Sequence, residues 1–396
     1  MRFDQPARVE RLLARHKGIV PGECFPGSPV LFRRDELLVA TEDADRVSDL
    51  AGRWMERSPD AVAAGVTRVQ LRRAAKIDVC ALADDLSTGR HGLIASPNHV
   101  LRGEPHYGGG PFDDPSPAPE LAGPVATGDA QRQVMVAILD TGITTHEWWD
   151  KSTWYEDCGP DVEDVVDADL DLELDSEAGH GTFVAGVVLQ HAPAAHLFID
   201  RVLSSDGVSD ELTLVRALHR LHGRFDGRGQ PLDVVNLSLG GYSYNNKPNP
   251  LLTKAISRFD RRTAIVASAG NAASDRPFWP AAIKRSIAVG ALDKSGAARA
   301  GFSNYGWWVD ACAGGEKVHS TFVRFDGPAK PAGDYDPDKF TGYAHWSGTS
   351  FAAPVVSGVI AATAAKENID AATAASRLLD SAGRTVADLG AVIGQP

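Results

Sequence analysis

Short apolar runs alternate with helical patterns through the C-terminal two thirds of the chain. The runs are continuous rather than alternating, which is typical of strands buried on both faces of a sheet. They lie at residues 134–139, 197–202, 234–237, 264–267 and 286–290. Between and after them, apolar residues recur at helical spacing at 180–190, 209–222, 250–261 and 350–365. This order predicts an α/β fold, a doubly wound and mostly parallel sheet with helices on both faces.

A different order precedes this region. Strand patterns lie at 30–41, 66–71 and 93–101, and helical patterns at 43–57 and 78–86. With one further strand of uncertain position, the order is β-α-β-β-α-β. It predicts a small α+β domain of the ferredoxin-like kind.

The stretch between these two regions is rich in Gly, Pro and Asp, a composition that favours an extended linker over a packed core. A chain of 396 residues is long enough for one large and one small core. We therefore predict four parts. They are an N-terminal extension at 1–29, a small domain at 30–103, a linker at 104–130 and a large domain at 131–396.

Composition and charge limit the partners. A hydrophobic content of 43% and a charged content of 23% are ordinary for a soluble globular protein. The net charge of −12 argues against nucleic acid and weakly favours basic peptides. Neither a signal peptide nor a membrane span is evident, so we expect a cytoplasmic protein without a membrane partner. The four cysteines are scattered without metal-binding spacing: Cys24, Cys80, Cys158 and Cys312.

Four polar residues stand where a parallel sheet places its ligands. Asp140 ends an apolar strand, and Asn271 follows another through a small-residue turn. His180 lies between two glycines at a helix start, and Ser350 lies in a small-residue turn before an apolar helix. Each has an ordinary alternative as a cap, a turn residue or a packed histidine. Together they meet the needs of acyl transfer, which are a nucleophile, a base, a group that orients the base and an oxyanion donor.

The motifs around these residues resemble those of the subtilisin-like serine proteases, in the family's order. They are Asp140-Thr141-Gly142, His180-Gly181-Thr182, Asn236-Leu237-Ser238-Leu239-Gly240-Gly241, Ala269-Gly270-Asn271, Phe302-Ser303-Asn304-Tyr305-Gly306 and Gly348-Thr349-Ser350-Phe351-Ala352-Ala353-Pro354. The resemblance implies a serine endopeptidase that needs no cofactor for its chemistry and acts on a protein or peptide.

The resemblance also implies roles for single residues. Ser350 would attack the scissile carbonyl, with His180 as general base and then acid, and Asp140 would orient His180. Asn271 and the Ser350 backbone N–H would hold the oxyanion. Ser238, Leu239 and Gly240 would pair with the substrate backbone, and Ser268, Ala269 and Gly270 would form a wall of the primary specificity pocket.

The small domain is similar to the inhibitory propeptide that many members of this family carry. Residues 95–100 resemble its closing strand, so residues 101–109 are expected to lie in the active-site cleft. This implies that the chain's own N-terminal domain is a partner of the large domain. It also implies self-cleavage within 102–120, near Tyr107.

Two segments depart from the family pattern. The acidic stretch at 156–177 alternates acidic and apolar residues at 167–175, which predicts a strand with one charged face. Three roles stay open for it: a solvated edge, attraction of basic substrate residues, or structural calcium, for which we assign no ligands. Residues 319–345 contain Pro, Gly, Asp and Lys and predict a surface loop.

Two other functions are alternatives to the endopeptidase. A catalytically silent subtilase fold with a binding or regulatory role is the alternative. An esterase or acyltransferase of the α/β-hydrolase kind needs Gly-x-Ser-x-Gly, which the sequence lacks. Without a signal peptide, limited processing of a dedicated protein or peptide partner is favoured over nutritional proteolysis.

Overall fold

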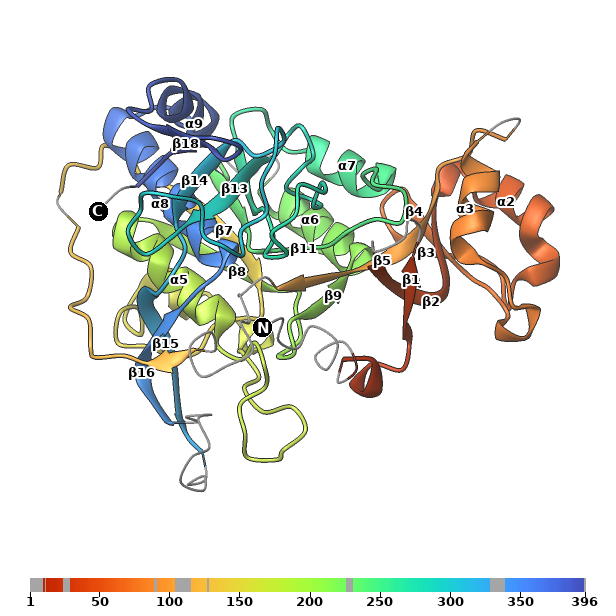
Figure 1. Ribbon diagram of the computed structural model, residues 1–396, viewed down its shortest axis with the longest axis horizontal. Coiled ribbons are helices and arrows are strands. Elements are labelled where there is room, and N and C mark those ends of the chain that lie inside the picture. Colours follow the sequence, from red (N-terminus) through yellow and green to blue (C-terminus); the bar gives the residue numbers. More distant parts are fainter. Residues whose placement is uncertain are drawn as a thin grey trace.

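The computed structural model describes residues 10, 12–23, 29–88, 91–103, 115–126, 128–225, 231–327 and 339–394. Two packed regions are visible in Figure 1, with the smaller, N-terminal region on the right. Cys24 and most of the predicted cleavage interval, including Tyr107, lie outside the described residues.

The N-terminal region has the β-α-β-β-α-β order expected from its sequence, with one additional strand in front. Its elements are β1 (Ile19–Glu23), β2 (Pro29–Ala40), α2 (Ala44–Ala51), β3 (Asp60–Ala63), β4 (Val66–Gln70), α3 (Val79–Ser87) and β5 (Ala95–Gly103). The strands lie in the order β5-β2-β4-β3, and neighbouring strands are antiparallel. The predicted helix at 43–57 is shorter, because the α-helix ends at Ala51 and a 3₁₀ turn (Gly52–Trp54) follows.

The two faces of this sheet bury different partners. Leu37 and Val39 on β2 share a core with α2 and α3. The alternate residues Leu38 and Ala40 join a core with helix α6 (Glu211–Phe225) of the larger region. Because successive strand residues point to opposite faces, the apolar run in β2 is buried from both sides.

The larger region contains the predicted doubly wound sheet, in the order β17-β18-β14-β13-β12-β10-β7-β8. All neighbouring pairs are parallel except β17 with β18. The strands are β7 (Met135–Asp140), β8 (His196–Arg201), β10 (Val234–Leu237), β12 (Ala264–Ser268), β13 (Ile287–Leu292), β14 (Ala311–Gly314), β17 (Thr385–Val386) and β18 (Gly390–Val392). The helices are α4 (Thr153–Glu156), α5 (His180–His191), α6, α7 (Pro250–Ser257), α8 (Thr349–Glu367) and α9 (Ala371–Asp380). Helix α7 is shorter than the predicted 250–261.

Helices cover both faces of this sheet, which confirms the predicted fold class. Side chains of α5, α8 and α9 pack on one face, together with Val136 and Ile138 of β7. Those of α6 and α7 pack on the other, together with Ala137 and Leu139. Among the described residues, α8 alone is long and apolar enough to cross a membrane, and 78% of its most apolar window is buried inside the protein. This burial is what a core helix requires.

Strand β5 joins the two regions. It leaves the N-terminal sheet and runs between two short strands of the larger region, β9 (Val208–Asp210) and β11 (Leu239–Gly240), as Figure 1 shows. Both pairings are antiparallel. The N-terminal region is therefore attached to the larger region by continuous backbone hydrogen bonding.

Two sequence predictions about insertions are wrong. The strands β15 (Val318–Asp326) and β16 (Lys339–Trp346) pair with each other antiparallel, with β6 (Ser116–Pro117) on the outer edge of β16. Phe322 and Tyr343 on these strands are buried, so the prediction of a surface loop is wrong for both strands, while the Pro and Gly residues that suggested it lie outside the described residues.

The predicted strand at 167–175 is absent. Leu170 and Leu172 have positive φ angles of 60° and 72° and are 82% and 65% exposed. The Asp167 carboxylate accepts the backbone N–H groups of residues 171 and 172 at 3.1 and 3.0 Å. The alternating pattern thus arises from turns in which aspartates bind the local backbone.

Candidate active site

The four predicted site residues gather at the carboxyl edge of the parallel sheet. Asp140 is the last residue of β7, and Asn271 follows β12, with β10 between these strands. His180 is the first residue of α5, and Ser350 is the second residue of α8. Strand ends and helix starts meet at this edge because each strand feeds a helix that returns across the sheet.

Asp140 and His180 form a buried pair. The Nδ1 atom of His180 lies 2.7 Å from Oδ1 of Asp140, and both residues are fully buried. The same carboxylate oxygen accepts the Thr141 N–H at 2.7 Å, which fixes its position. The Nε2 atom of His180 has no hydrogen-bond partner among the described residues. This geometry presents Nε2 as the proton acceptor, because Nδ1–H is held by Asp140.

The pKa of His180 is raised above its ordinary value. Burial on its own lowers this pKa, but the Asp140 carboxylate opposes it through its charge and hydrogen bond. Glu177 and Asp164 add to the raising effect. The negative surroundings therefore favour the imidazolium that a general base becomes.

Ser350 lies at the N-terminus of α8 and is fully buried. Its Oγ donates to the carbonyl oxygen of Ser238 at 3.0 Å, and the Ser238 Oγ donates to the Ser350 carbonyl at 2.8 Å. The sequence-predicted substrate strand and the predicted nucleophile are thus in direct contact. The helix start also supplies backbone N–H groups and positive partial charge beside Ser350.

Asn271 is tied to the same helix start. Its Oδ1 accepts the Thr349 backbone N–H at 3.0 Å, and the Gly270 N–H donates to Oγ1 of Thr349 at 3.0 Å. Because Oδ1 accepts the Thr349 N–H at the start of α8, the Nδ2 group is the end of the amide that can donate to a bound oxygen. Asn271 and Ser350 are therefore both held at the start of α8.

The predicted pocket wall is held by a residue to which sequence reasoning gave no role. Asn304 donates from Nδ2 to the Ala269 carbonyl at 2.8 Å, and its backbone N–H donates to Gly270 O at 2.9 Å. Ser268 and Ala269 are fully buried, and Gly270 has φ +95°. Asn304 belongs to the Phe-Ser-Asn-Tyr-Gly motif seen in the sequence, but the motif alone does not indicate what this Asn contacts.

One glycine beside His180 is required by a close backbone approach. A Cβ at Gly181 would lie 2.1 Å from the carbonyl oxygen of Gly142, and backbone cannot move aside cheaply. The Asp-Thr-Gly and His-Gly-Thr motifs are therefore packed against each other. A side chain at this position would separate Asp140 from His180.

Asp164, which the sequence analysis placed in the acidic stretch without a role, lies behind this pair. Its Oδ2 accepts from Oγ1 of Thr141 at 2.8 Å and from the Gly179 N–H at 3.0 Å. Burial raises the pKa of Asp164 to about 7, and the Asp140 charge adds to that effect. Asp164 thus changes charge near neutral pH, close to the groups that would carry the reaction.

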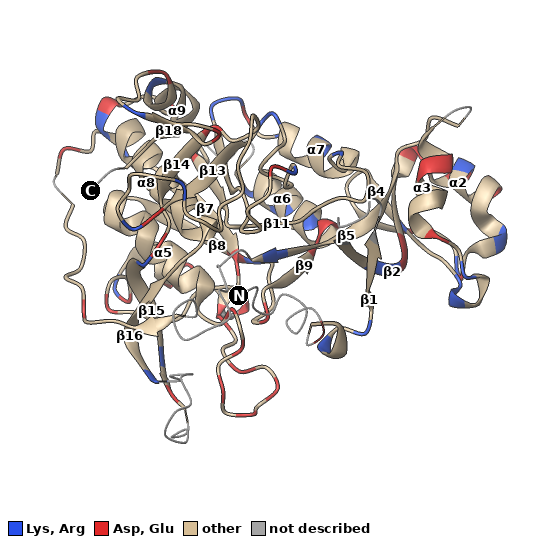
Figure 2. Ribbon diagram, in the orientation of Figure 1, with Lys and Arg blue, Asp and Glu red and all other residues tan. Residues whose placement is uncertain are grey.

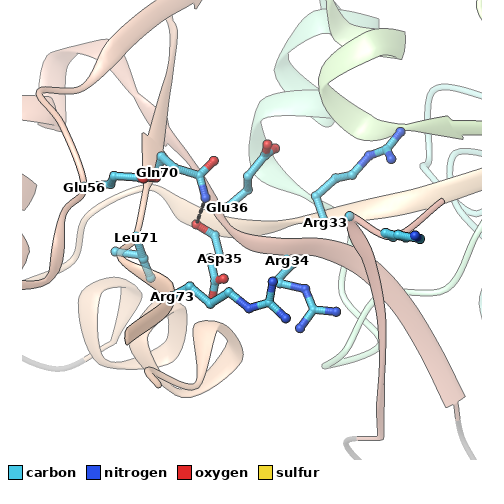
Figure 3. Close-up of a pocket in the computed structure, with 10 residues that line it drawn as sticks. Arg33, Arg34, Asp35, Glu36, Glu56, Gln70, Leu71 and Arg73 are labelled. Carbon is cyan, nitrogen blue, oxygen red and sulfur yellow. Dashed lines mark hydrogen bonds between the residues drawn. The ribbon is translucent and has the colours of Figure 1, made fainter. Parts of the chain in front are cut away.

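Two other features are weaker candidates. Asp167, Asp169 and Asp171 have carboxylate oxygens within 4.8 Å of one another, close enough to share a cation, but clustered exposed acids are common without one. A hollow in the N-terminal region is shown in Figure 3. It is lined by both signs of charge, and its Arg33 is bound to Asp210 at 2.7 Å, so it offers no defined ligand chemistry.

The larger region is similar to known proteins. Residues 131–392 match the model of the subtilase family. Subtilisin BL from Lederbergia lenta is 32% identical over 241 residues, which are 58% of this chain and 75% of that protein. M-protease from Shouchella clausii is also 32% identical, over 58% of this chain and 53% of that protein. The match thus spans about half the length of M-protease.

Solved structures show the same similarity. A protease from Pseudoalteromonas arctica matches with a TM-score of 0.53 and 26% identity, over 67% of this chain and 89% of that one. A cold-adapted subtilisin-like serine proteinase matches with a TM-score of 0.50 and 25% identity, over 70% of this chain and 94% of that one. The chain belongs to the subtilase family.

Proposed function

We propose that the chain hydrolyses peptide bonds through Ser350, His180 and Asp140, and that its N-terminal domain inhibits it by occupying the cleft. The observation that carries the catalytic part is the buried 2.7 Å contact between His180 Nδ1 and Asp140 at the start of a helix beside α8. No feature of the described residues favours the alternative of a silent fold.

In this mechanism the Ser350 hydroxyl turns from the Ser238 carbonyl to Nε2 of His180. Ser350 Oγ then bonds to the scissile carbonyl carbon while its proton passes to Nε2. The same proton goes to the leaving amine as the C–N bond breaks. His180 then takes a proton from a water molecule, whose oxygen bonds to the acyl carbon. The bond from that carbon to Ser350 Oγ breaks, and Oγ takes the proton back from His180. Asp140 stays ionised throughout and stabilises the imidazolium.

The oxygen of the tetrahedral intermediate needs donors that are already in place. Asn271 Nδ2 and the Ser350 backbone N–H are the proposed donors, because Asn271 is fixed by Thr349 at the start of α8. Preorganised donors of this kind act strongly, since they need no rearrangement as charge develops. No cofactor takes part in these steps.

The proposed inhibition rests on the position of β5. Its residues Val100–Arg102 pair with β9, and Arg102 and Gly103 pair with β11. An extended chain between two antiparallel strands is how a peptide substrate adds to a sheet edge. We therefore extend the proposal to self-cleavage within 102–120, followed by limited processing of a protein or peptide partner.

Replacing the proposed nucleophile tests the catalytic part. Ser350→Ala is expected to lower peptide hydrolysis by roughly 10³-fold or more, because the bond-forming oxygen is removed. The change removes a single oxygen atom, so the far-ultraviolet circular dichroism spectrum should stay close to that of the wild type. Hydrolysis of proteome-derived peptides at the wild-type rate by this variant would contradict the proposal.

Self-cleavage is tested by intact mass. Freshly purified wild-type protein is expected to contain two fragments with a junction within 102–120, and Ser350→Ala is expected to stay full-length. If both proteins keep the full mass of 42.1 kDa, the N-terminal domain is a permanent part of the protein.

The charge of Asp164 predicts a pH dependence of stability. Its pKa is raised from 3.8 to about 7, so the folded state holds a proton that the unfolded chain loses near pH 4. The Asp164 contribution to the free energy of unfolding is therefore highest below pH 4, and it falls as pH rises to about 7. We compare the free energy of unfolding of Asp164→Asn with that of the Asp164 protein, both in a Ser350→Ala background. The difference should rise in favour of Asp164→Asn by about 2–4 kcal/mol between pH 4 and pH 8. Urea unfolding at both pH values measures this, and an unchanged difference would contradict it.

A further inference from the structure

The strand pairing defines which position of a bound chain faces which residue. Arg102 pairs with Gly240 and Gly103 with Leu239, so β5 runs toward Ser238, whose carbonyl accepts from Ser350 Oγ. A substrate bound in this register places its next residue opposite Ser238. The backbone carbonyl of that substrate residue is the first one that can reach Ser350. The position held by Gly103 is therefore the second residue before the scissile bond.

Glu177 faces this position. A Cβ at Gly103 would lie 1.7 Å from Oε2 of Glu177 and 3.4 Å from a methyl carbon of Leu203. Gly103 does not have a positive φ, so its backbone accepts any L-residue and space alone limits the choice. The nearest atom belongs to the far end of a flexible side chain, which can turn to contact a substrate side chain.

The surrounding chain makes room for this carboxylate and holds its backbone. Gly207, next to β9, has φ +69°, and a Cβ there would lie 1.9–2.2 Å from the carboxylate atoms of Glu177. The Glu177 N–H donates to Ser205 O at 2.8 Å, and its carbonyl accepts the His180 N–H at 3.1 Å. Glu177 is fully buried. The carboxylate is thus built into the wall of the cleft three residues before His180.

A positively charged side chain, Arg15, already pairs with the acidic residues of this wall. The guanidinium of Arg15 lies 2.6 Å from Asp206, 2.9 Å from Asp175 and 3.0 Å from Asp169. Asp206 adjoins Gly207, and Asp175 lies two residues before Glu177. In Figure 2 the loop with several red segments below the N label belongs to the acidic stretch that precedes α5. The wall therefore has a negative potential that favours a further positive group.

We propose that Glu177 determines specificity at the second residue before the scissile bond, and that it selects lysine or arginine there, with glycine tolerated. This inference rests on the proposed function. A basic side chain displaces the carboxylate and pairs with it, whereas an aliphatic side chain displaces it without compensation. An acidic side chain at that position places like charges together and is rejected. The proposal gives the acidic stretch a role in attracting basic substrates through one buried residue.

Peptide cleavage tests the proposal directly. Proteome-derived peptides are first incubated with the wild-type protein to find the sequence that is cut best. A matched set of peptides is then made from that sequence, with Lys, Gly, Leu or Glu as the second residue before the scissile bond. We expect kcat/KM for Lys to exceed that for Leu by roughly tenfold or more, and Glu177→Gln to reduce this ratio to about twofold or less. Glu177→Gln also changes the surroundings of His180, but that effect is common to all peptides and cancels in the ratio.

A matched control removes a neighbouring charge. Asp206→Asn loses one carboxylate from the same wall without contact to position 103, so the Lys-to-Leu ratio should stay within about twofold of the wild type. A wild-type protein that cuts peptides without a basic preference, or an unchanged preference in Glu177→Gln, overturns the inference while the proposed function stands. Absence of any cutting by the wild type counts against the proposed function instead.

A second measurement does not need catalysis. In the full-length Ser350→Ala chain, Gly103→Lys should leave hydrogen exchange of the 98–103 amides close to that of the parent, while Gly103→Leu and Gly103→Glu should accelerate it. Adding Glu177→Gln should remove the advantage of Lys over Leu. Equal exchange for Lys and Leu with Glu177 intact overturns the inference.

Discussion

The antiparallel pairing of β5 with β9 and β11 is the interaction on which the arrangement of the two domains depends. It holds β9 and β11 against an extended chain, and it directs that chain toward Ser238, whose carbonyl accepts from Ser350 Oγ. Side chains reinforce it from the N-terminal side. His99 Nδ1 lies 2.9 Å from the Glu211 carboxylate, and the Tyr244 N–H donates to His99 Nε2 at 3.2 Å. Because these groups are buried, separating the domains exposes unpaired polar atoms as well as apolar surface.

The chemistry in turn depends on burying charge beside Ser350. Asp140, Asp164 and Glu177 all act on His180, and each is almost or fully buried. Buried carboxylates are costly unless they have partners, so their presence here favours positive charge on the imidazole and on a bound substrate. One electrostatic arrangement thus supports both the proposed role of His180 as a base and the proposed substrate preference.

Sequence reasoning predicted the parallel sheet because buried strands and covering helices have distinct apolar periods, and it located the motif residues now found at one edge. It could not predict the pairing of β15 with β16, since the turn-forming residues between them in the sequence concealed two packed strands. It was wrong about residues 167–175, where aspartates bind the local backbone instead of lining a strand. Glu177 and Asp164 were seen only as members of an acidic run, because burial depends on contacts between distant segments.

The most direct test of the account is the rate at which a fluorophosphonate labels Ser350, in the intact chain or in the complex of its two fragments, followed by intact mass and peptide mapping. Leu101 in β5 is 1% exposed and packs in the core of the larger region, so Leu101→Asp should free the cleft and Leu101→Met should not. The account predicts labelling at Ser350 in each protein, roughly tenfold faster or more in Leu101→Asp than in the wild type and Leu101→Met. Equal rates in all three proteins, or labelling at another residue, would contradict it.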